Sequence, residues 1–204
     1  MILAGGLSSR MGKEKATLKI ESKPLIKWAC DMANGFSDHV YVSVHDDEGA
    51  DRLRPLLPLG TAYLLDLYDS PRCVLLALLS CFRQIRQEYI AVFPVDSPFM
   101  NPNVMMEMTS KCEEYDLVIP LWPDGKLEAI HAVYDRKTTL PVLEELWKSK
   151  TLGLWEIAKK SKRTLFISTE SLAELDPPLL SLLDADTPTE FEALKAAKSD
   201  RART

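Results

Sequence analysis

Short apolar runs alternate with longer amphipathic stretches along this chain. The β-branched and apolar residues of these runs predict strands at 1–3, 39–44, 63–65, 89–94, 117–121, 131–134, 164–167 and in a short segment ending near Leu183. Helical spacing of apolar positions predicts helices over 24–34, 73–86, 103–112, 140–148, 152–160 and 189–198. Asp186 or Thr187 would cap the last helix, next to Pro188. The alternation is typical of βα units, so we expect an α/β fold whose sheet is mostly parallel and carries helices on both faces.

No feature of the sequence divides the chain. Its 13 prolines and 8 glycines are dispersed, and no Gly/Ser linker, low-complexity tract or repeat interrupts it. With 204 residues, 46% of them hydrophobic and 27% charged, the chain is long enough to bury a sizeable core. We therefore expect a single domain over residues 1–204.

The charge and the apolar runs narrow the function classes. A net charge of −5 does not favour a nucleic-acid partner, so any substrate phosphates must be met locally by basic groups, backbone amides or a metal. The apolar start is shorter than a signal-peptide core, and no run approaches the roughly 18 residues of a membrane span. These patterns predict a cytoplasmic protein with neither nucleic-acid nor membrane partners.

The four cysteines are spaced too irregularly for a zinc knuckle or a redox pair. Cys30, Cys73, Cys81 and Cys112 lie in apolar stretches, where a thiol behaves as a small hydrophobe. We expect them to be reduced.

Ligands of such sheets bind beyond the carboxyl ends of the strands, and the first such turn is rich in glycine and basic residues. Residues 3–16 read LAGGLSSRMGKEKA. Gly5 and Gly6 permit positive φ angles and close backbone approach, so that N–H groups can face phosphate oxygens; Ser8 adds a hydroxyl, and Arg10 and Lys15 add positive charge. A simple glycine turn with solvated basic residues is the alternative. The expected nucleotide-binding residues of this turn are Leu3, Ala4, Gly5, Gly6, Ser8 and Lys15.

This turn carries neither GxxxxGK[ST] nor GxGxxG, which argues against the common ATPase and dehydrogenase loops. Its pattern LAGGxSxRMGxxKA instead resembles the signature of nucleotidyltransferases with a Rossmann-like sheet, most closely the molybdenum cofactor guanylyltransferases. The resemblance implies the three-layer fold of the nucleotide-diphospho-sugar transferase type. It continues in KPLI at 23–26, where Ser22 replaces the family's glycine.

A second turn presents Asp96 directly after the strand at 89–94, in the run VFPVDSPF. A carboxylate at the end of a buried strand is costly unless it is paired or binds a cation, and Pro98 stiffens the turn. Asp96 as the cap of the next helix is the alternative. The similarity to the family's DxPF element implies that Asp96 holds Mg²⁺.

A third turn, DADTP at 184–188, is similar to the family's late [ND]x[ND]TPEDL element. Asp184 and Asp186 are two positions apart, so on an extended segment they point to opposite faces. The resemblance implies a metal or nucleotide role for one of them, without deciding which; for Asp186, helix capping is the alternative.

Two weaker matches complete the resemblance. EAIHAVY at 128–134 is similar to EPLHALY and implies that Glu128 and His131 approach the acceptor substrate, whereas His131 as a satisfied core histidine is the alternative. SPRCV at 70–74 replaces the family's GPLAG and loses both glycines. Just upstream, Asp66 or Asp69 stands where the family has an acidic residue near the base or ribose, and Asp66 is favoured because it ends a strand.

The resemblance implies a Mg²⁺-dependent transfer of GMP from GTP to molybdopterin, with Arg10, Lys15, Asp96 and the metal as the catalytic groups. The resemblance also implies GTP as the donor, because Gly6, the fourth letter of LAGG, is the residue of the guanine enzymes of the family, whereas the cytidine enzymes have alanine there. The expected partners are thus GTP and the molybdenum cofactor, and the chain is expected to be a monomer or a weak homo-oligomer. Rival functions are GMP transfer to a cobinamide phosphate, CMP transfer to molybdopterin, and nucleotide sensing without turnover.

Overall fold

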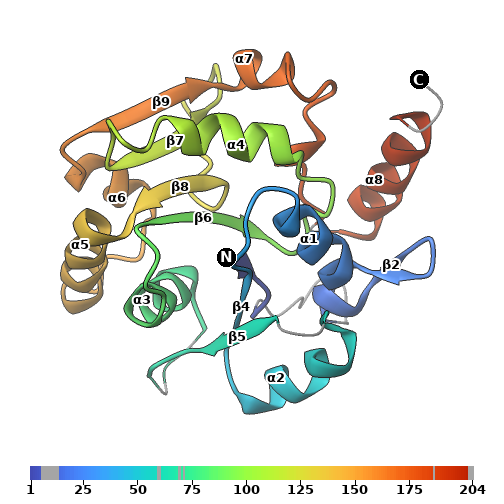
Figure 1. The fold of residues 1–204 in the computed structure, drawn as a ribbon, viewed down its shortest axis with the longest axis horizontal. Coiled ribbons are helices and arrows are strands. Elements are labelled where there is room, and N and C mark those ends of the chain that lie inside the picture. The colour runs from blue at the N-terminus through green and yellow to red at the C-terminus, as the bar shows by residue number, and fades with distance from the viewer. Residues whose placement is uncertain (6–13, 59–60, 69, 71, 186, 202–204) are drawn as a thin grey trace.

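The structure, a computed structural model, describes residues 1–5, 14–58, 61–68, 70, 72–185 and 187–201 (Figure 1). Its strands form a seven-stranded sheet in the order β5-β4-β1-β6-β8-β7-β9. Neighbouring strands are parallel except at β8, which runs antiparallel to both β6 and β7. The strands are β1 (Ile2–Leu3), β4 (Tyr41–Val44), β5 (Ala62–Leu65), β6 (Tyr89–Pro94), β7 (Leu117–Leu121), β8 (Ala132–Asp135) and β9 (Thr164–Ser168).

Helices cover both faces of this sheet (Figure 1). One face packs against α1 (Leu25–Asn34), α2 (Asp47–Leu53), α4 (Pro102–Ser110) and α7 (Thr169–Ala173), and α8 (Pro188–Arg201) adds a side chain to this core. The other face packs against α3 (Val74–Gln84), α5 (Arg136–Lys148) and α6 (Trp155–Lys160). The described connections contain the short 3-10 helices η1 (Lys15–Thr17), η2 (Arg54–Leu56) and η3 (Leu180–Leu182).

The strands divide their side chains between the two cores because successive residues of a strand point to opposite faces. In β7, Val118 packs in the first core, whereas Leu117 and Ile119 pack in the second. In β6, Phe93 packs in the first core and Val92 packs in the second. Each such buried side chain contributes on the order of 1.5–3 kcal/mol relative to exposure, so the apolar runs that predict strands also stabilise the three layers.

The predicted three-layer α/β fold is confirmed, and β7 coincides with its predicted bounds. The predicted strand ending near Leu183 is wrong, because the chain there forms η3. The Asp176 carboxylate accepts hydrogen bonds from the Ser181 backbone N–H at 2.7 Å and from its hydroxyl at 2.6 Å, which curls the segment into a tight turn. Of the two predicted caps of α8, Thr187 exchanges hydrogen bonds with Glu190 as a capping box; Asp186 lies outside the described residues.

The elements that were not expected include α7, α2 and a hairpin. Helix α2 begins at Asp46, whose side chain accepts a 2.8 Å hydrogen bond from the Gly49 backbone N–H. A two-stranded hairpin joins β2 (Lys19–Ile20) to β3 (Lys23–Pro24). Both residues of its turn have positive φ, 50° at Glu21 and 68° at Ser22. Ser22 therefore occupies a left-handed conformation that glycine adopts more easily.

Across the helices of the described residues, none combines the length and the apolar character needed to span a bilayer.

Candidate functional site

Residues after β1, β4, β5 and β6 line a cavity of about 450 Å³, a volume typical of small-molecule sites. It lies at the carboxyl ends of these parallel strands, where α/β sheets bind ligands. The residues on its wall are Leu3, Gly5, Lys15, Ser43, His45, Asp66, Arg72, Cys73, Val74, Ala77, Pro94, Val95, Asp96, Ile130 and Asp184.

Gly5 allows the loop after β1 to pass close to the loop after β4. A Cβ atom at Gly5 would lie 3.2 Å from the backbone nitrogen of His45, which is tighter than an ordinary contact. The preceding Ala4 is buried, and its N–H donates to the Ser43 carbonyl at 3.0 Å. Glycine at this position therefore favours close packing of two backbones beside the cavity.

Lys15 and Asp96 form an ion pair in the cavity wall. Lys15 begins η1, and Asp96 follows β6, where the Val95 N–H donates to the Leu3 carbonyl at 3.0 Å. Asp96 does not cap the next helix, because Asn101 accepts the 2.9 Å hydrogen bond from the Asn103 N–H at the start of α4. The site thus places a cation and a carboxylate side by side at the ends of the two central strands.

Asp184 faces the same cavity, and its carboxylate is hydrogen-bonded to a buried side chain. The Ser97 hydroxyl donates to its Oδ1 at 2.5 Å, and His131 Nε2 lies 2.8 Å from the Ser97 oxygen. Ser97 and His131 are fully buried. Burial raises the pKa of Asp184, and Asp96 and Glu128 add in the same direction. Two carboxylates of the cavity, Asp96 and Asp184, therefore lie close enough to influence each other.

Glu128 and His131, expected near the acceptor, lie behind the cavity rather than on its wall. The Glu128 carboxylate accepts hydrogen bonds from Trp122 Nε1 at 2.6 Å and from Lys126 Nζ at 2.7 Å, and its Oε2 lies 3.7 Å from His131 Nδ1. Burial alone would raise the pKa of Glu128, but His131, Lys126 and Trp122 together lower it to about 2. Both residues thus support the wall from within the core.

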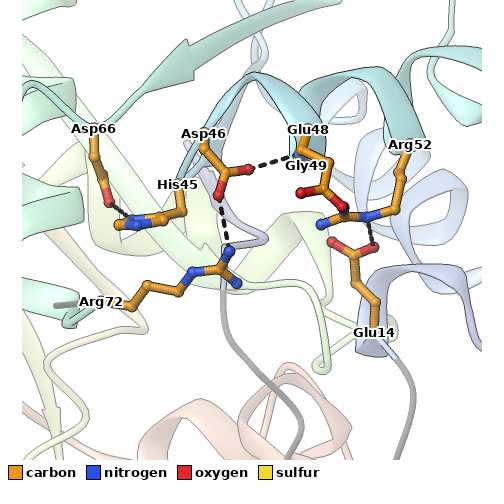
Figure 2. Close-up of polar contacts among 8 residues, drawn as sticks. All are labelled: Glu14, His45, Asp46, Glu48, Gly49, Arg52, Asp66 and Arg72. Carbon is orange, nitrogen blue, oxygen red and sulfur yellow. Dashed lines mark hydrogen bonds and ion pairs between the residues drawn. The ribbon is translucent and has the colours of Figure 1, made fainter. Parts of the chain in front are cut away.

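Two pairs of polar residues lie together after β4 and β5 (Figure 2), and His45, Asp66 and Arg72 of these pairs are on the cavity wall. His45 Nδ1 lies 2.7 Å from Asp66 Oδ2, and Arg72 Nη2 lies 2.9 Å from Asp46 Oδ2. The register of β4 and β5, in which Val44 is opposite Leu65, brings the residues after these strands together. Burial raises the pKa of Asp66, whereas the Gly49 N–H and Arg72 lower the pKa of Asp46.

Sequence reasoning missed His45 and Arg72. The available signal was the position of His45 directly after the predicted strand at 39–44, at a carboxyl end of the sheet. Arg72 stands in the segment that departs from the family's glycine-rich pattern. That departure brings a cation to the cavity wall.

Most of the expected site residues that the structure describes meet at this cavity. Those on the wall are Leu3, Gly5, Lys15, Asp66, Asp96 and Asp184. Gly6, Ser8, Arg10 and Asp186, as well as the alternative Asp69, lie outside the described residues.

The cysteines separate into core and cavity positions. Cys30, Cys81 and Cys112 are buried, and burial raises their pKa to about 11, 11 and 12, respectively. Cys73 is partly exposed and lies on the cavity wall at the start of α3.

Comparison with known proteins identifies similar sequences over most of the chain. The profile of the MobA-like NTP transferase domain matches residues 1–164. A protein of Methanosarcina mazei named probable molybdenum cofactor guanylyltransferase is 27% identical over 196 residues, covering 94% of this chain and 87% of its own. The molybdenum cofactor guanylyltransferase of Campylobacter jejuni is 30% identical over 124 residues, covering 60% of this chain and 61% of its own.

Solved structures share the fold. Molybdopterin-guanine dinucleotide biosynthesis protein A of Archaeoglobus fulgidus superimposes with a TM-score of 0.84 at 20% identity, covering 98% of this chain and 97% of its own. A 4-diphosphocytidyl-2C-methyl-D-erythritol synthase of Anaerococcus prevotii superimposes with a TM-score of 0.72 at 11% identity, covering 97% and 94%. At these identities the likeness concerns the fold.

Proposed function

Because this chain belongs to the MobA-like NTP transferase family, whose profile matches residues 1–164, we propose that it transfers GMP from GTP to the molybdenum cofactor and releases pyrophosphate. Its relatives in Methanosarcina mazei and Campylobacter jejuni carry the name molybdenum cofactor guanylyltransferase. The A. fulgidus protein with a similar fold is named for molybdopterin-guanine dinucleotide biosynthesis. Nucleotidyl transfer is the activity common to the family.

The observation that carries this proposal is the convergence of Lys15, Asp96 and Asp184 on one cavity. In the reaction, an oxygen of the acceptor's terminal phosphate forms a bond to the α-phosphorus of GTP, and the bond from that phosphorus to the bridging oxygen of the β-phosphate breaks. The phosphate acceptor is already an anion, so no general base is required. Lys15 would neutralise charge that develops on the triphosphate, and Arg10 would assist it.

The donor set fits a magnesium ion. Among the described residues no group of three or more His, Cys, Asp or Glu side chains is arranged to hold a metal. Mg²⁺ usually binds one or two carboxylates together with substrate phosphates, and Asp96 and Asp184 supply two carboxylates on one wall. When bound with the triphosphate, Mg²⁺ would neutralise phosphate charge and orient the α-phosphorus.

Pyrophosphate release tests the assignment. The protein is incubated with Mg²⁺ and one of GTP, CTP, ATP or UTP, each with and without molybdenum cofactor. We expect release that requires both GTP and the cofactor, together with a guanine dinucleotide product identified by mass spectrometry. Release with CTP in preference to GTP would favour the cytidylyl alternative, and binding without release would favour a sensor.

The proposed metal role of Asp96 has its own test. Asp96→Asn removes one negative charge from the expected ligand, so we predict that turnover falls by at least ~10²-fold and that more Mg²⁺ is needed for half-maximal activity. The thermal unfolding curve should stay near that of the wild type. An unchanged magnesium titration would exclude Asp96 from the metal site.

A further inference from the structure

His45 and Arg72 share an arrangement: each faces the cavity, and each is oriented by a carboxylate (Figure 2). Asp66 holds the ring of His45, and Asp46 holds the guanidinium of Arg72. Asp46 is itself fixed, because its other carboxylate oxygen accepts the Gly49 N–H at the start of α2. Side chains held in this way have lost much of their rotamer freedom before any ligand arrives.

The carboxylate of Asp66 determines which nitrogen of neutral His45 carries the proton. With Oδ2 of Asp66 2.7 Å from Nδ1, the proton resides on Nδ1 and is donated to the carboxylate. Nε2 then has a free lone pair and acts as a hydrogen-bond acceptor. Since the His45 side chain is 18% exposed and lines the cavity, it presents an acceptor to a ligand there.

Arg72, in contrast to His45, presents hydrogen-bond donors to the cavity. A guanidinium has five N–H donors and no acceptor, and its contact with Asp46 uses only one of its terminal nitrogens. The side chain is 29% exposed and lines the cavity, so its remaining donors can meet a ligand. The cavity therefore contains a fixed acceptor and a fixed donor on neighbouring loops.

We propose that His45 and Arg72 recognise the Watson–Crick edge of the guanine base, with His45 Nε2 accepting from the N1–H and Arg72 donating to O6. The inference rests on the proposed use of GTP. Guanine presents an acceptor at O6 beside donors at N1 and N2, which complements this pair. Adenine and cytosine present an amino donor where guanine has O6 and a ring acceptor beside it, so both contacts would be mismatched.

Asp66 acts through His45 in this arrangement rather than on the base. Its side chain is only 6% exposed; Oδ2 is bonded to His45, and Oδ1 is buried without a hydrogen-bond partner among the described residues. The family resemblance implies an acidic residue near the base or ribose at this position. Asp66 is thus a positioning residue for His45, whose role the sequence did not reveal.

Nucleotide binding without acceptor tests the proposal. Dissociation constants are measured calorimetrically for GTP, ATP and the triphosphate of 2-aminopurine riboside, which lacks both O6 and the N1 proton. We expect wild type to bind GTP roughly 10- to 100-fold more tightly than either analogue, because a base without matching groups leaves buried polar atoms unpaired. Arg72→Ala and His45→Ala should each weaken GTP binding and narrow this ratio, while binding of the 2-aminopurine nucleotide changes little.

Conservative variants distinguish recognition of the base from simple electrostatic attraction of the triphosphate. His45→Asn keeps an acceptor and should retain more of the preference for GTP than His45→Ala does. Asp46→Ser keeps a capping side chain for α2 but removes the partner of Arg72. The preference for GTP over the two analogues should therefore fall without loss of the fold. Arg54→Ala removes a guanidinium that pairs with Asp51 outside the cavity and should change none of the three dissociation constants.

The outcomes distinguish this inference from the proposed function. If Arg72→Ala and His45→Ala weaken all three nucleotides by the same factor, the two residues attract the triphosphate and do not read the base, and the inference is overturned while GTP use stands. If wild type already binds GTP and ATP equally, guanine selectivity itself fails and the proposed substrate fails with it. Because the readout is a ratio of constants in one protein sample, partial unfolding of a variant does not imitate either result.

Discussion

The pairing of Lys15 with Asp96 brings opposite charges together in a site that must bind a highly anionic nucleotide. The two side chains are 17% and 10% exposed, so water screens their attraction only partly. In the proposed reaction, a triphosphate with Mg²⁺ would offer each of them a new partner, phosphate oxygens for Lys15 and the metal for Asp96. On this proposal the ion pair is a resting arrangement that keeps both groups ordered until the substrate replaces it.

Removal of the lysine tests this view at the residue scale. Lys15→Ala is predicted to lower turnover by at least ~10²-fold, the scale seen when one electrostatic stabiliser of a transition state is lost. Steady-state pyrophosphate release measures the effect. Lys23→Ala is the matched control, since Lys23 pairs with Asp31 away from the cavity and its loss should leave turnover unchanged. A Lys15→Ala enzyme with more than about half the wild-type rate would refute the role of this loop.

The hydroxyl of Ser97 is predicted to orient Asp184 for the metal. Ser97→Ala removes the 2.5 Å hydrogen bond to Asp184, so we expect the Mg²⁺ concentration for half-maximal activity to rise by roughly tenfold, as for other residues that support metal ligands. Ser181→Ala deletes another fully buried hydroxyl, which bonds to Asp176 instead. It should lower stability without changing the magnesium requirement, and equal requirements in both variants would contradict the prediction.

At the scale of the element, the β2–β3 hairpin contains a residue in an unfavourable backbone conformation. Ser22 has φ of 68° and an exposed side chain, and a non-glycine residue in the left-handed region costs about 1 kcal/mol or more. Ser22→Gly relieves this cost but adds freedom to the unfolded chain, so we predict a net gain of about 0.5–1 kcal/mol. The melting temperature should rise by about 1–4 °C in calorimetry. Ser22→Ala should give no gain in stability. A fall in melting temperature on Ser22→Gly would show that the backbone at Ser22 is not strained.

The elements recovered from the sequence are those with a strong apolar period. Strand β7 is apolar along its whole length because both its faces are buried, which makes it easy to recognise. Helix α2 was missed because it is only seven residues long and contains Gly49, so it offers few apolar positions. The leucine-rich segment near Leu183 has the composition of a strand, but Asp176 bends it through hydrogen bonds that composition does not reveal.

For the molecule as a whole, the buried Glu128 links stability to pH. Its pKa falls from 4.5 to about 2 on folding, because the hydrogen-bonding partners of its carboxylate outweigh burial. The folded state then binds this proton less tightly than the unfolded state, so the contribution is complete above pH 4.5 and is lost as the pH falls toward 2. It amounts to up to about 3 kcal/mol.

Denaturant unfolding measured between pH 7 and pH 2.5 checks this linkage. Wild type should lose stability more steeply below pH 4.5 than Glu128→Gln, which cannot ionise at this position. Glu145→Gln, at a largely exposed carboxylate paired with Lys160, is the control and should follow the wild-type curve. Parallel curves for wild type and Glu128→Gln would show that the partners of Glu128 do not favour its charged form.

The site as a whole was predictable where residues belong to sequence motifs. Lys15 and Asp96 came from motifs that follow β1 and β6, Asp184 came from a motif that follows η3, and the structure brings all three to one cavity. His45 and Arg72 depend on the register of β4 with β5 and on ion pairs to Asp66 and Asp46, and such contacts between distant segments leave no local pattern.

The distribution of the cysteines makes the protein suitable for labelling without engineering. Of the four thiols, all of which the structure describes, three are buried with raised pKa values and should react slowly, whereas Cys73 is accessible at the cavity wall. A maleimide dye applied near neutral pH would therefore attach at one position. Since that position lies beside Arg72, nucleotide entry would alter the surroundings of the dye, and its fluorescence would follow binding in real time on the native chain.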